Sequence, residues 1–203
     1  DGTLMSDSIG YSEAAAGVMA FNGVVDEFRI YEGVLSEKQI AAMVETLGEK
    51  ITEDYQGTRP VMVCVLKGAS LFFTDLCREI DLNIDMDFIS VSSYGTSSKS
   101  SGVVKLNKDV DVDITGRDVI IVDDIIDAGL TLKHLKTLFS TRGPKSVKTI
   151  ALLDKKVRHD PELTPDYVGF QCPDYFVVGY GLDYANNYRN LPYIGILKDE
   201  VFR

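Results

Sequence analysis

One segment constrains the fold of this chain more than any other: residues 119–131, with the sequence VIIVDDIIDAGLT. It opens with a run of β-branched apolar residues, as expected for a strand buried on both faces of a parallel sheet. Asp123 and Asp124 end the strand, and Asp127 and Gly129 lie in a tight turn that leads into a helix. The backbone N–H groups of such a turn and the dipole of the helix attract a phosphate group. The segment therefore predicts an α/β fold with an anion site at the end of a central strand.

The rest of the chain alternates between strand and helix patterns. Ser36 followed by Gln39 predicts a capping box that opens a helix. The predicted helices cover residues 37–55, 71–80 and 132–140, and the predicted strands cover residues 61–66, 87–91, 118–124, 147–153, 167–170 and 175–180. This order predicts a doubly wound sheet, in which ligands bind at the carboxyl ends of the strands. We therefore expect the chemistry to lie just after Leu66, Val91, Val122, Leu153 and Tyr180.

Length, charge and cysteine usage exclude several classes of protein. With 203 residues, 45% of them hydrophobic, the chain can bury one sizeable core. The net charge of −10 argues against a nucleic-acid surface, so a bound phosphate must depend on local donors such as a helix N-terminus. We expect no membrane span and a cytoplasmic location, because no apolar stretch approaches ~20 residues and no secretory signal is visible. The 3 cysteines show neither a disulfide framework nor a metal-binding spacing.

The first part of the chain differs in character from the rest. Residues 1–33 are rich in Gly, Ser and Ala, and only residues 24–31 alternate as a strand does. Residues 21–36 loosely resemble the final strand of a laminin-G or concanavalin-like lectin module, but they are too few to fold as one. We therefore predict an N-terminal extension of unassigned role over residues 1–33 and one folded domain over residues 34–203.

The acidic pair Asp123 and Asp124 leaves several classes open when it is taken alone. An apolar strand that ends in two aspartates also occurs in receiver domains and in nucleotide hydrolases. Two carboxylates beside a phosphate repel it unless they bind hydroxyl groups or a metal, and a ribose with Mg²⁺ meets both conditions. With IIDAGLT added, the segment resembles the phosphoribosyl-pyrophosphate motif of type I phosphoribosyltransferases. Ala128 departs from that motif, in which a hydroxyl residue is common.

Further motifs narrow this resemblance. They are VLKGA at residues 65–69, SSYG at 92–95, LLDKK at 152–156, PDYFVVGYGLDY at 173–184, and Arg189. In this order they are similar to the hypoxanthine-guanine phosphoribosyltransferases in their bacterial form, over residues 35–202. The resemblance implies the type I phosphoribosyltransferase fold, a central, mostly parallel sheet flanked by helices with a small hood region. It also implies purine salvage by a homo-oligomer, a dimer or tetramer, that uses Mg²⁺ to transfer the 5-phosphoribosyl group from phosphoribosyl pyrophosphate to N9 of hypoxanthine or guanine, giving IMP or GMP.

Carried over to the matching positions, the resemblance implies a site for each part of the sugar substrate. Lys67, Gly68 and Arg189 would hold the pyrophosphate, with a non-proline cis peptide bond before Lys67 that turns its N–H toward the ligand. Ser93 and Tyr94 would lie on a flexible loop that closes over the site. The phosphoribosyl group and its 5′-phosphate would bind to Asp123, Asp124, Asp127, Ala128, Gly129, Leu130 and Thr131.

The resemblance also implies a site for the purine. Lys155 would donate a hydrogen bond to the 6-oxo group, and a lysine cannot accept one from the 6-amino group of adenine. Phe176 would stack on the base, the Val177 backbone would read its edge, and Asp183 would lie beside it. Asp127 would act as the general base that takes the N7 proton. Mg²⁺ would be bound by Asp123, Asp124 and Asp183.

Each of these residues also has an explanation that needs no ligand. Lys67 fits a solvated strand end, Phe176 a core aromatic, Asp127 a helix cap and Asp183 a turn carboxylate. Three other proteins also remain as alternatives: a xanthine-preferring transferase, a non-catalytic regulator that senses phosphoribosyl pyrophosphate, and a receiver domain. The regulator would lack the catalytic aspartate or carry a basic face, and a receiver domain would not explain LKGA or FVVGYGLDY.

Overall fold

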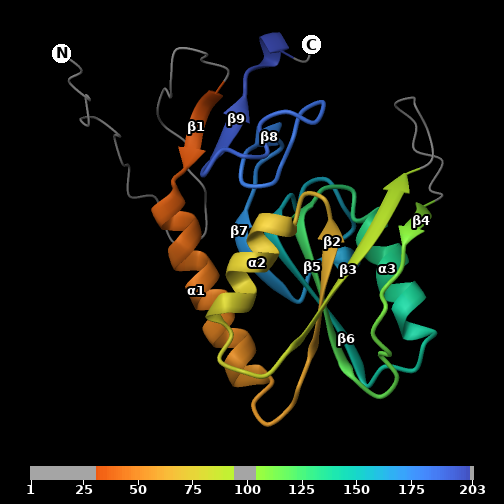
Figure 1. Cartoon of the computed structure of the whole chain (residues 1–203). Coiled ribbons are helices and arrows are strands. Elements are labelled where there is room, and N and C mark those ends of the chain that lie inside the picture. The colour runs from red at the N-terminus through yellow and green to blue at the C-terminus, as the bar shows by residue number, and fades with distance from the viewer. Residues whose placement is uncertain (1–30, 94–103, 202–203) are drawn as a thin grey trace.

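The computed structural model describes residues 31–93 and 104–201. Within these residues the strands form two sheets, one of six strands in the order β4-β3-β2-β5-β6-β7 and one of three in the order β1-β9-β8 (Figure 1). The helices are α1 (Glu37–Asp54), α2 (Ser70–Glu79) and α3 (Leu130–Ser140). The strands are β1 (Tyr31–Leu35), β2 (Val61–Leu66), β3 (Asp85–Ser93), β4 (Val104–Lys108), β5 (Asp118–Ile126), β6 (Ser146–Asp154), β7 (Tyr167–Gln171), β8 (Val177–Val178) and β9 (Ile194–Leu197).

The six-stranded sheet is parallel except at one edge. β2, β3, β5, β6 and β7 pair in parallel, whereas β4 runs antiparallel to β3. Burial on both faces explains the unbroken apolar runs of β2 and β5, since neither face of these central strands meets water. The predicted mostly parallel sheet flanked by helices is confirmed.

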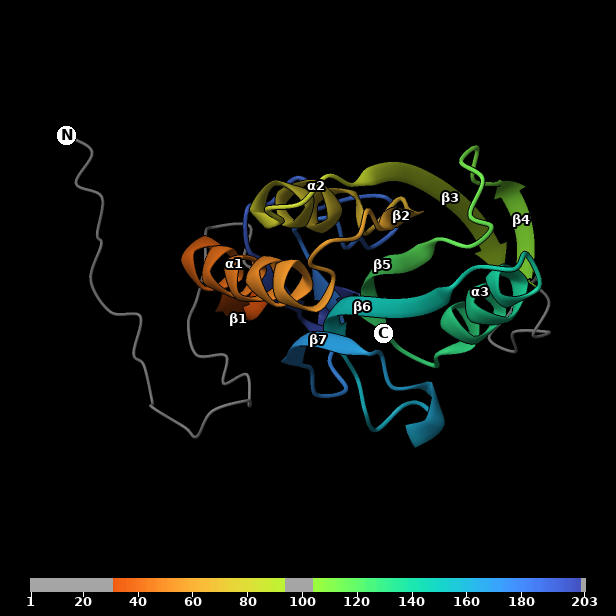
Figure 2. The ribbon, with the colours of Figure 1, turned by 90° about the horizontal axis from the view of Figure 1, so that it is seen from below.

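Helices cover the two faces of this sheet differently. Met62 and Cys64 of β2 pack in the cluster that contains the buried faces of α1 and α2. Val63, which points the other way, packs in the cluster that contains Leu135 and Phe139 of α3. Figure 2 shows α1 and α2 on one side of the strands and α3 on the other. The sheet is therefore fixed from both sides, and its carboxyl end is left for ligands.

The predicted capping box at the start of α1 is present. The Gln39 backbone N–H donates to Ser36 Oγ over 3.4 Å, and the Ser36 N–H donates to Gln39 Oε1 over 3.0 Å. These bonds satisfy N–H groups that have no partner inside the helix. The cap fixes the point at which the chain leaves β1 and enters α1.

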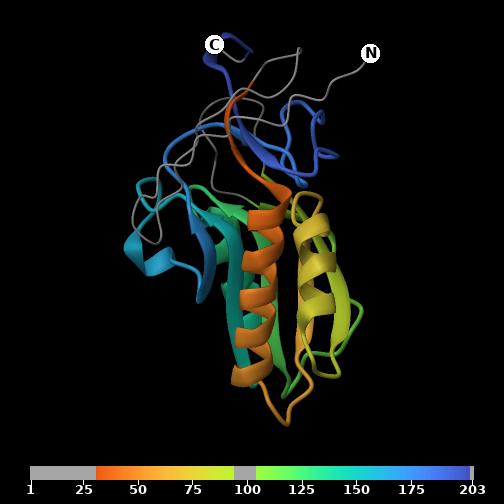
Figure 3. The same ribbon diagram turned by 90° about the vertical axis from the view of Figure 1, so that its left-hand side faces the viewer.

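The three-stranded sheet, which we call the hood, lies beyond the carboxyl ends of the parallel strands (Figures 1 and 3). β9 is its central strand and pairs antiparallel with both neighbours, with Val34 opposite Gly195 and Val177 opposite Ile196. The predicted boundary between residues 33 and 34 falls inside β1, whose pairing with β9 begins at Tyr31. The proposed extension before Tyr31 lies outside the described residues, so its separate role stays a prediction.

Several predicted bounds were wrong. The helix predicted from residue 132 begins at Leu130, directly after Gly129. The strand predicted over residues 175–180 is reduced to Val177–Val178, because Gly179, Tyr180 and Gly181 have φ angles of 99°, 49° and 98°, which no strand accommodates. Strands β4 and β9 were not predicted, and the strand-like alternation at residues 24–31 meets β1 only at Tyr31.

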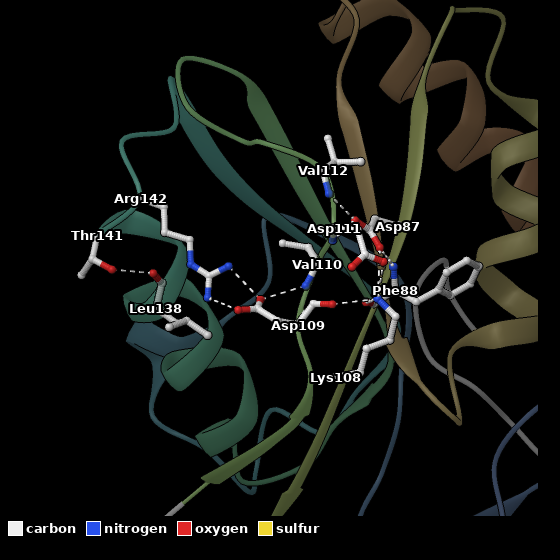
Figure 4. Close-up of polar contacts among 10 residues, drawn as sticks. All are labelled: Asp87, Phe88, Lys108, Asp109, Val110, Asp111, Val112, Leu138, Thr141 and Arg142. Carbon is white, nitrogen blue, oxygen red and sulfur yellow. Dashed lines mark hydrogen bonds and ion pairs between the residues drawn. The ribbon is translucent and has the colours of Figure 1, made fainter.

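The connection after β4 is attached to the sheet by Asp87 of β3 (Figure 4). The buried Asp87 carboxylate accepts N–H groups from Phe88 at 2.6 Å, Asp111 at 2.6 Å and Val112 at 2.8 Å. Arg142, just beyond α3, donates two hydrogen bonds of 2.7 and 2.8 Å to the carboxylate of Asp109. These bonds hold the β3–β4 edge of the sheet against α3.

Candidate active site

Two neighbouring cavities lie where the hood meets the carboxyl end of the six-stranded sheet. The Phe176 cavity has a volume of about 210 Å³ and is lined by Asp124, Ile125, Asp127, Lys155, Phe176, Val177, Leu182 and Asp183. The Gly129 cavity has a volume of about 240 Å³ and is lined by Asp123, Ile125, Ile126, Asp127, Ala128, Gly129, Leu130, Thr131 and Leu132. Asp127 and Ile125 line both, so the cavities meet at the start of the turn after β5.

The two cavities bring together residues that are far apart in the sequence. All seven residues predicted to bind the phosphoribosyl group line one cavity or the other. The four predicted to bind the purine all line the Phe176 cavity, although they come from the residue after β6, from β8 and from residues before and after β8. The structure thus places these residues together, while their roles toward a ligand stay predictions.

The Gly129 cavity is formed by the turn between β5 and α3. Gly129 has a φ of 71°, in the left-handed region that glycine adopts without steric cost. A Cβ at this position would also lie 2.9 Å from Leu163 Cδ1, so the turn has no room for a larger residue. α3 begins at the next residue, and the N–H groups of its first turn have no partner inside the helix. They give this cavity the donors that an anion requires.

Asp123 and Asp124 present two carboxyl groups at the end of β5. Burial raises the pKa of Asp123 well above its usual range, and the negative charge of Asp124 raises it further. Burial also raises the pKa of Asp124, against the opposing effects of the hydrogen bonds from Asp123 and the Ile125 backbone and of the Arg189 charge. Ligand hydroxyl groups or a cation would favour the ionised pair. This is the environment expected for residues that bind a sugar or a metal.

Gly68 packs directly against the side chain of Asp124. A Cβ on Gly68 would overlap Oδ2 of that carboxylate, and a Cβ on Gly181 would overlap the Gly68 carbonyl oxygen. The peptide bond between Leu66 and Lys67 is cis, as predicted. Lys67 is exposed beside this contact. The turn after β2 therefore approaches both β5 and the hood so closely that it depends on two glycines.

Arg189 joins the hood to this cluster. Its Nη2 lies 2.6 Å from Asp183 Oδ1, and its Nη1 donates to the Gly181 carbonyl oxygen over 2.5 Å. The Gly181 N–H in turn donates to the Arg189 carbonyl oxygen over 2.9 Å. The Arg189 charge also acts on Asp124, whose pKa it lowers. Two of the predicted pyrophosphate residues, Gly68 and Arg189, thus lie beside the Asp124 carboxylate, and Lys67 directly precedes Gly68.

The Phe176 cavity has an aromatic wall and a cationic wall. Phe176 is 38% exposed and meets Tyr184 edge to face, with ring centroids 5.5 Å apart. Lys155 is 7% exposed, and its backbone N–H donates to the Ile126 carbonyl oxygen over 3.0 Å. Its Nζ lies 4.0 Å from Asp174 Oδ1. A half-exposed ring and a buried ammonium group on one small cavity suit a flat polar ligand.

Asp127 has a partner that the sequence did not indicate. Arg158 Nε lies 2.9 Å from Asp127 Oδ1, and Arg158 Nη1 lies 3.5 Å from Asp174 Oδ2. The Asp127 hydrogen bond, followed by the charges of both carboxylates, raises the pKa of Arg158. Arg158 reaches Asp127 because a turn after Lys155, in which the Arg158 N–H donates to the Lys155 carbonyl oxygen, folds the chain back.

Two expectations find no support in the described residues, the closing loop and a cluster of metal ligands. Tyr94 and the side chain of Ser93 fall outside them, so the predicted closing loop stays a prediction. No three or more His, Cys, Asp or Glu residues are grouped as metal ligands within residues 31–93 and 104–201, so Asp123, Asp124 and Asp183 do not form such a cluster by themselves. None of the described helices has the length and apolar character needed to cross a bilayer.

Comparison with known proteins decides the family. The model of the phosphoribosyl transferase domain matches residues 31–185. A hypoxanthine-guanine phosphoribosyltransferase from Bacillus subtilis is 52% identical over 169 residues, which cover 83% of this chain and 94% of that protein. The chain belongs to the hypoxanthine-guanine phosphoribosyltransferase family. The predicted resemblance is confirmed, and the receiver domain is excluded.

Solved structures of the hypoxanthine-guanine phosphoribosyltransferase family agree with the fold. A hypoxanthine phosphoribosyltransferase from Staphylococcus aureus superimposes with a TM-score of 0.82 at 43% identity, covering 86% of this chain and 95% of that one. A hypoxanthine-guanine phosphoribosyltransferase from Bacillus anthracis, which holds a HEPES molecule in its active site, gives a TM-score of 0.78 at 49% identity and covers 82% of this chain and 99% of that one. The type I phosphoribosyltransferase fold is therefore confirmed.

Proposed function

We propose that this chain transfers the 5-phosphoribosyl group from phosphoribosyl pyrophosphate to N9 of hypoxanthine or guanine, releasing pyrophosphate. The observation that carries the proposal is the position of Asp127, which lines the Gly129 cavity and the Phe176 cavity at once. A sugar phosphate in the first cavity and a purine in the second would meet at this residue. Family membership supports the same activity.

The sugar phosphate fits the Gly129 cavity. The 5′-phosphate would accept hydrogen bonds from the N–H groups around Gly129 and from the Thr131 hydroxyl, at the positive end of α3. The ribose hydroxyls would donate hydrogen bonds to Asp123 and Asp124. These bonds would offset the desolvation cost of the buried carboxylates. A neutral sugar edge and a charged phosphate thus meet complementary groups.

The purine fits the Phe176 cavity. Its ring would stack on Phe176, and its 6-oxo group would accept a hydrogen bond from the ammonium group of Lys155. A lysine donates but does not accept, so adenine would leave the buried ammonium group without a partner. Such a mismatch typically costs orders of magnitude in specificity. The site therefore favours 6-oxopurines.

Asp127 would accept the proton that the purine loses during the reaction. As N9 attacks C1 of the sugar, a new C–N bond forms, and the C–O bond to pyrophosphate breaks with its electron pair on the leaving oxygen. The purine then loses its N7 proton, which Asp127 would accept as general base. The ion pair with Arg158 aims this carboxylate before substrate arrives. General base help of this kind contributes about 10²–10⁴ in rate.

The leaving pyrophosphate would meet Lys67, Arg189 and Mg²⁺. The described residues fit Mg²⁺ if phosphate oxygens supply part of its coordination, because this ion is usually bound through one or two carboxylates plus substrate phosphates. Asp123, Asp124 and Asp183 are the carboxylates that would hold it. When bound, Mg²⁺ would supply positive charge to the leaving group. Lys67 and Arg189 would bind the same oxygens and stabilise the charge that develops there.

A base panel tests the proposal and its alternatives in one assay. The full chain is mixed with Mg²⁺, phosphoribosyl pyrophosphate and each of hypoxanthine, guanine, xanthine and adenine, and nucleotide formation is followed. Rapid use of hypoxanthine or guanine, with adenine used at least about 10³-fold less well, is the expected result. Preference for xanthine would assign the alternative transferase. Binding of phosphoribosyl pyrophosphate with no nucleotide from any base would assign the sensing regulator.

We also propose a cytoplasmic protein that assembles as a dimer or tetramer, without a nucleic-acid or membrane partner. The support for this is the relatives' family and the net charge of −10. Light scattering of the purified chain would give the assembly directly, and a mass equal to one chain would contradict it.

A further inference from the structure

Asp154, the residue before Lys155, forms a buried ion pair with His159. His159 Nε2 is 2.6 Å from Asp154 Oδ1, and the two side chains are 1% and 0% exposed. The pair joins the last residue of β6 to the connection between β6 and β7, residues 155–166. Nothing in the proposed reaction uses it directly. A buried charge is kept only where another charge and hydrogen bonds compensate it.

The surroundings of the ring assign its charge. Nε2 faces the Asp154 carboxylate, and Nδ1 lies 2.9 Å from the carbonyl oxygen of Asp160. A neutral imidazole has one N–H and would turn a lone pair toward one of these oxygens, whereas an imidazolium donates to both. Gln171 Nε2 donates to the other Asp154 oxygen over 3.3 Å, as expected if Asp154 is ionised. The geometry thus describes an imidazolium paired with a carboxylate.

The pair anchors the connection that carries the base-site cations. Lys155 follows Asp154 directly and lines the Phe176 cavity, and Arg158 precedes His159 and contacts Asp127. Further along the connection, Leu163 packs where a Cβ of Gly129 would lie, against the turn of the Gly129 cavity. The His159 side chain is a buried link between this connection and the sheet, so its loss should loosen the turn that carries Lys155 and Arg158.

We propose that His159 is a positioning residue for the base site: its imidazolium, paired with Asp154, holds Lys155 in the Phe176 cavity and Arg158 against Asp127. The inference rests on the proposed function, because it assigns the purine to the cavity that Lys155 lines. Hypoxanthine binding should then depend on the charge of His159. Binding of phosphoribosyl pyrophosphate, which uses the turn and the hood, should depend on it much less.

Charged groups face His159 from each neighbouring element. Asp154 of β6 contacts it directly, Asp127 of the β5–α3 turn acts at longer range, and the adjacent Arg158 opposes them. The Asp160 carboxylate accepts the Glu162 N–H instead. Burial lowers the pKa of His159, but the Asp160 carbonyl and the Asp154 carboxylate outweigh it and raise the pKa above the ordinary value. The paired state therefore persists to a higher pH than the imidazolium of an ordinary histidine does, and it is lost as the pH rises through the raised value.

Nuclear magnetic resonance on the ligand-free protein tests the charge. The chain has 2 histidines, so ¹⁵N-labelled ring signals are assigned by comparison with a His134→Gln variant. Both nitrogens of His159 should show the shift of an imidazolium at about pH 7, above the ordinary titration point of ~6.5. A neutral His159 ring at that pH overturns the inference whatever the transferase activity is. A protein that lacks that activity fails the proposed function instead, and the two failures are thus distinguished.

Steady-state kinetics test the positioning role. His159→Gln should raise the KM for hypoxanthine about tenfold at about pH 6, with the KM for phosphoribosyl pyrophosphate changed less than about threefold. The ratio of variant to wild-type KM should fall toward one as the pH rises, because the wild type then loses its imidazolium. His159→Arg keeps a cation and should retain a low KM at high pH. His134→Gln, the matched control, should follow the wild type throughout.

Two outcomes overturn the positioning role. One is an unchanged hypoxanthine KM in His159→Gln at about pH 6, below the ordinary titration point of ~6.5, where the imidazolium predominates. The other is an equal rise in the KM of both substrates, which marks general loosening of the fold. Should His159→Gln fail to fold because Asp154 is left as a buried charge, the double variant Asp154→Asn with His159→Gln removes both charges and takes its place in the same assay.

Discussion

The Asp124 carboxylate occupies the space that a side chain on Gly68 would need. The turn after β2 and the end of β5 therefore pack so closely that no atom can be added between them. Gly181 repeats the pattern, since its missing Cβ leaves room for the Gly68 carbonyl oxygen. These contacts tie the predicted pyrophosphate, ribose and hood residues into one packed unit, in which a small change at one position moves the others.

Gly68→Ala should lower kcat/KM for phosphoribosyl pyrophosphate by about 10²-fold, because the added methyl group displaces Asp124 or the turn by about 1 Å. The melting temperature should change little, since the site lies at the rim of the sheet. Initial rates at varied phosphoribosyl pyrophosphate measure the effect. Ser70→Ala, two residues along, removes an atom instead of adding one and should behave like the wild type; full activity in Gly68→Ala would show that Asp124 needs no fixed position.

Asp127→Asn should reduce kcat by about 10²–10⁴, the usual contribution of a general acid or base. Affinity for phosphoribosyl pyrophosphate should stay within about tenfold, because the amide still fits the turn. Asp174→Asn is the matched control, since Asp174 contacts the same guanidinium of Arg158 but lies outside both cavities. Equal turnover in both variants, measured by stopped-time assays of nucleotide formation, would remove Asp127 from the proton step.

Lys155→Ala should weaken the use of hypoxanthine and guanine and narrow the gap between these bases and adenine. The lost hydrogen bond from a buried charged donor is worth about 1.5–3 kcal/mol, or roughly 10–100-fold in kcat/KM. Lys156→Ala changes the exposed neighbour and should have no such effect. Competition between hypoxanthine and adenine in one reaction measures the selectivity. Unchanged selectivity would show that the 6-oxo group is recognised elsewhere.

Asp87→Asn should destabilise the fold by about 2 kcal/mol near pH 7, because a carboxylate with several backbone donors is replaced by an amide. Burial alone raises the pKa of Asp87, but the N–H groups of Val112, Phe88 and Asp111 outweigh it and lower the pKa. The stabilisation is therefore fully present above about pH 3.9, the pKa of an aspartate in the unfolded chain. It is lost as the pH falls through the lower pKa of Asp87 in the folded protein.

Urea unfolding at neutral and acid pH measures this difference. The difference in the free energy of unfolding between wild type and Asp87→Asn should narrow as the pH falls below the pKa of an aspartate in the unfolded chain. Asp111→Asn is the control, because that side chain is 86% exposed and contributes its N–H, not its carboxylate, to Asp87. A gap that stays constant with pH would show that the carboxylate charge is not involved.

The sequence predicted the elements whose pattern is local. The apolar runs of β2 and β5 and the capping box of α1 lie where they were expected, because burial on both faces and helix capping leave a mark within a few residues. β9 was missed because its four residues are a strand through pairing with distant segments: Gly195 lies opposite Val34 of β1 and Val178 of β8, and such pairing leaves no local pattern in so short a segment.

For the candidate site too, local features could be predicted from the sequence and long-range contacts could not. The turn at Gly129 could be predicted because one continuous segment forms it. The contact of Arg158 with Asp127 and the pairing of Asp154 with His159 could not, because both depend on how the β6–β7 connection folds back over the sheet. The closeness of Gly68 to Asp124 likewise follows from the pairing of β2 with β5, which composition does not reveal.

The hood and the six-stranded sheet divide the site between them. Val177 belongs to the hood and Phe176 directly precedes it, whereas the Gly129 turn follows β5 of the larger sheet. If the proposed base site is right, substitutions of hood residues that face the Phe176 cavity should change the choice of base more than they change the binding of phosphoribosyl pyrophosphate. A scaffold of this kind lets a lineage of enzymes diversify by changing its acceptor and keeping its donor.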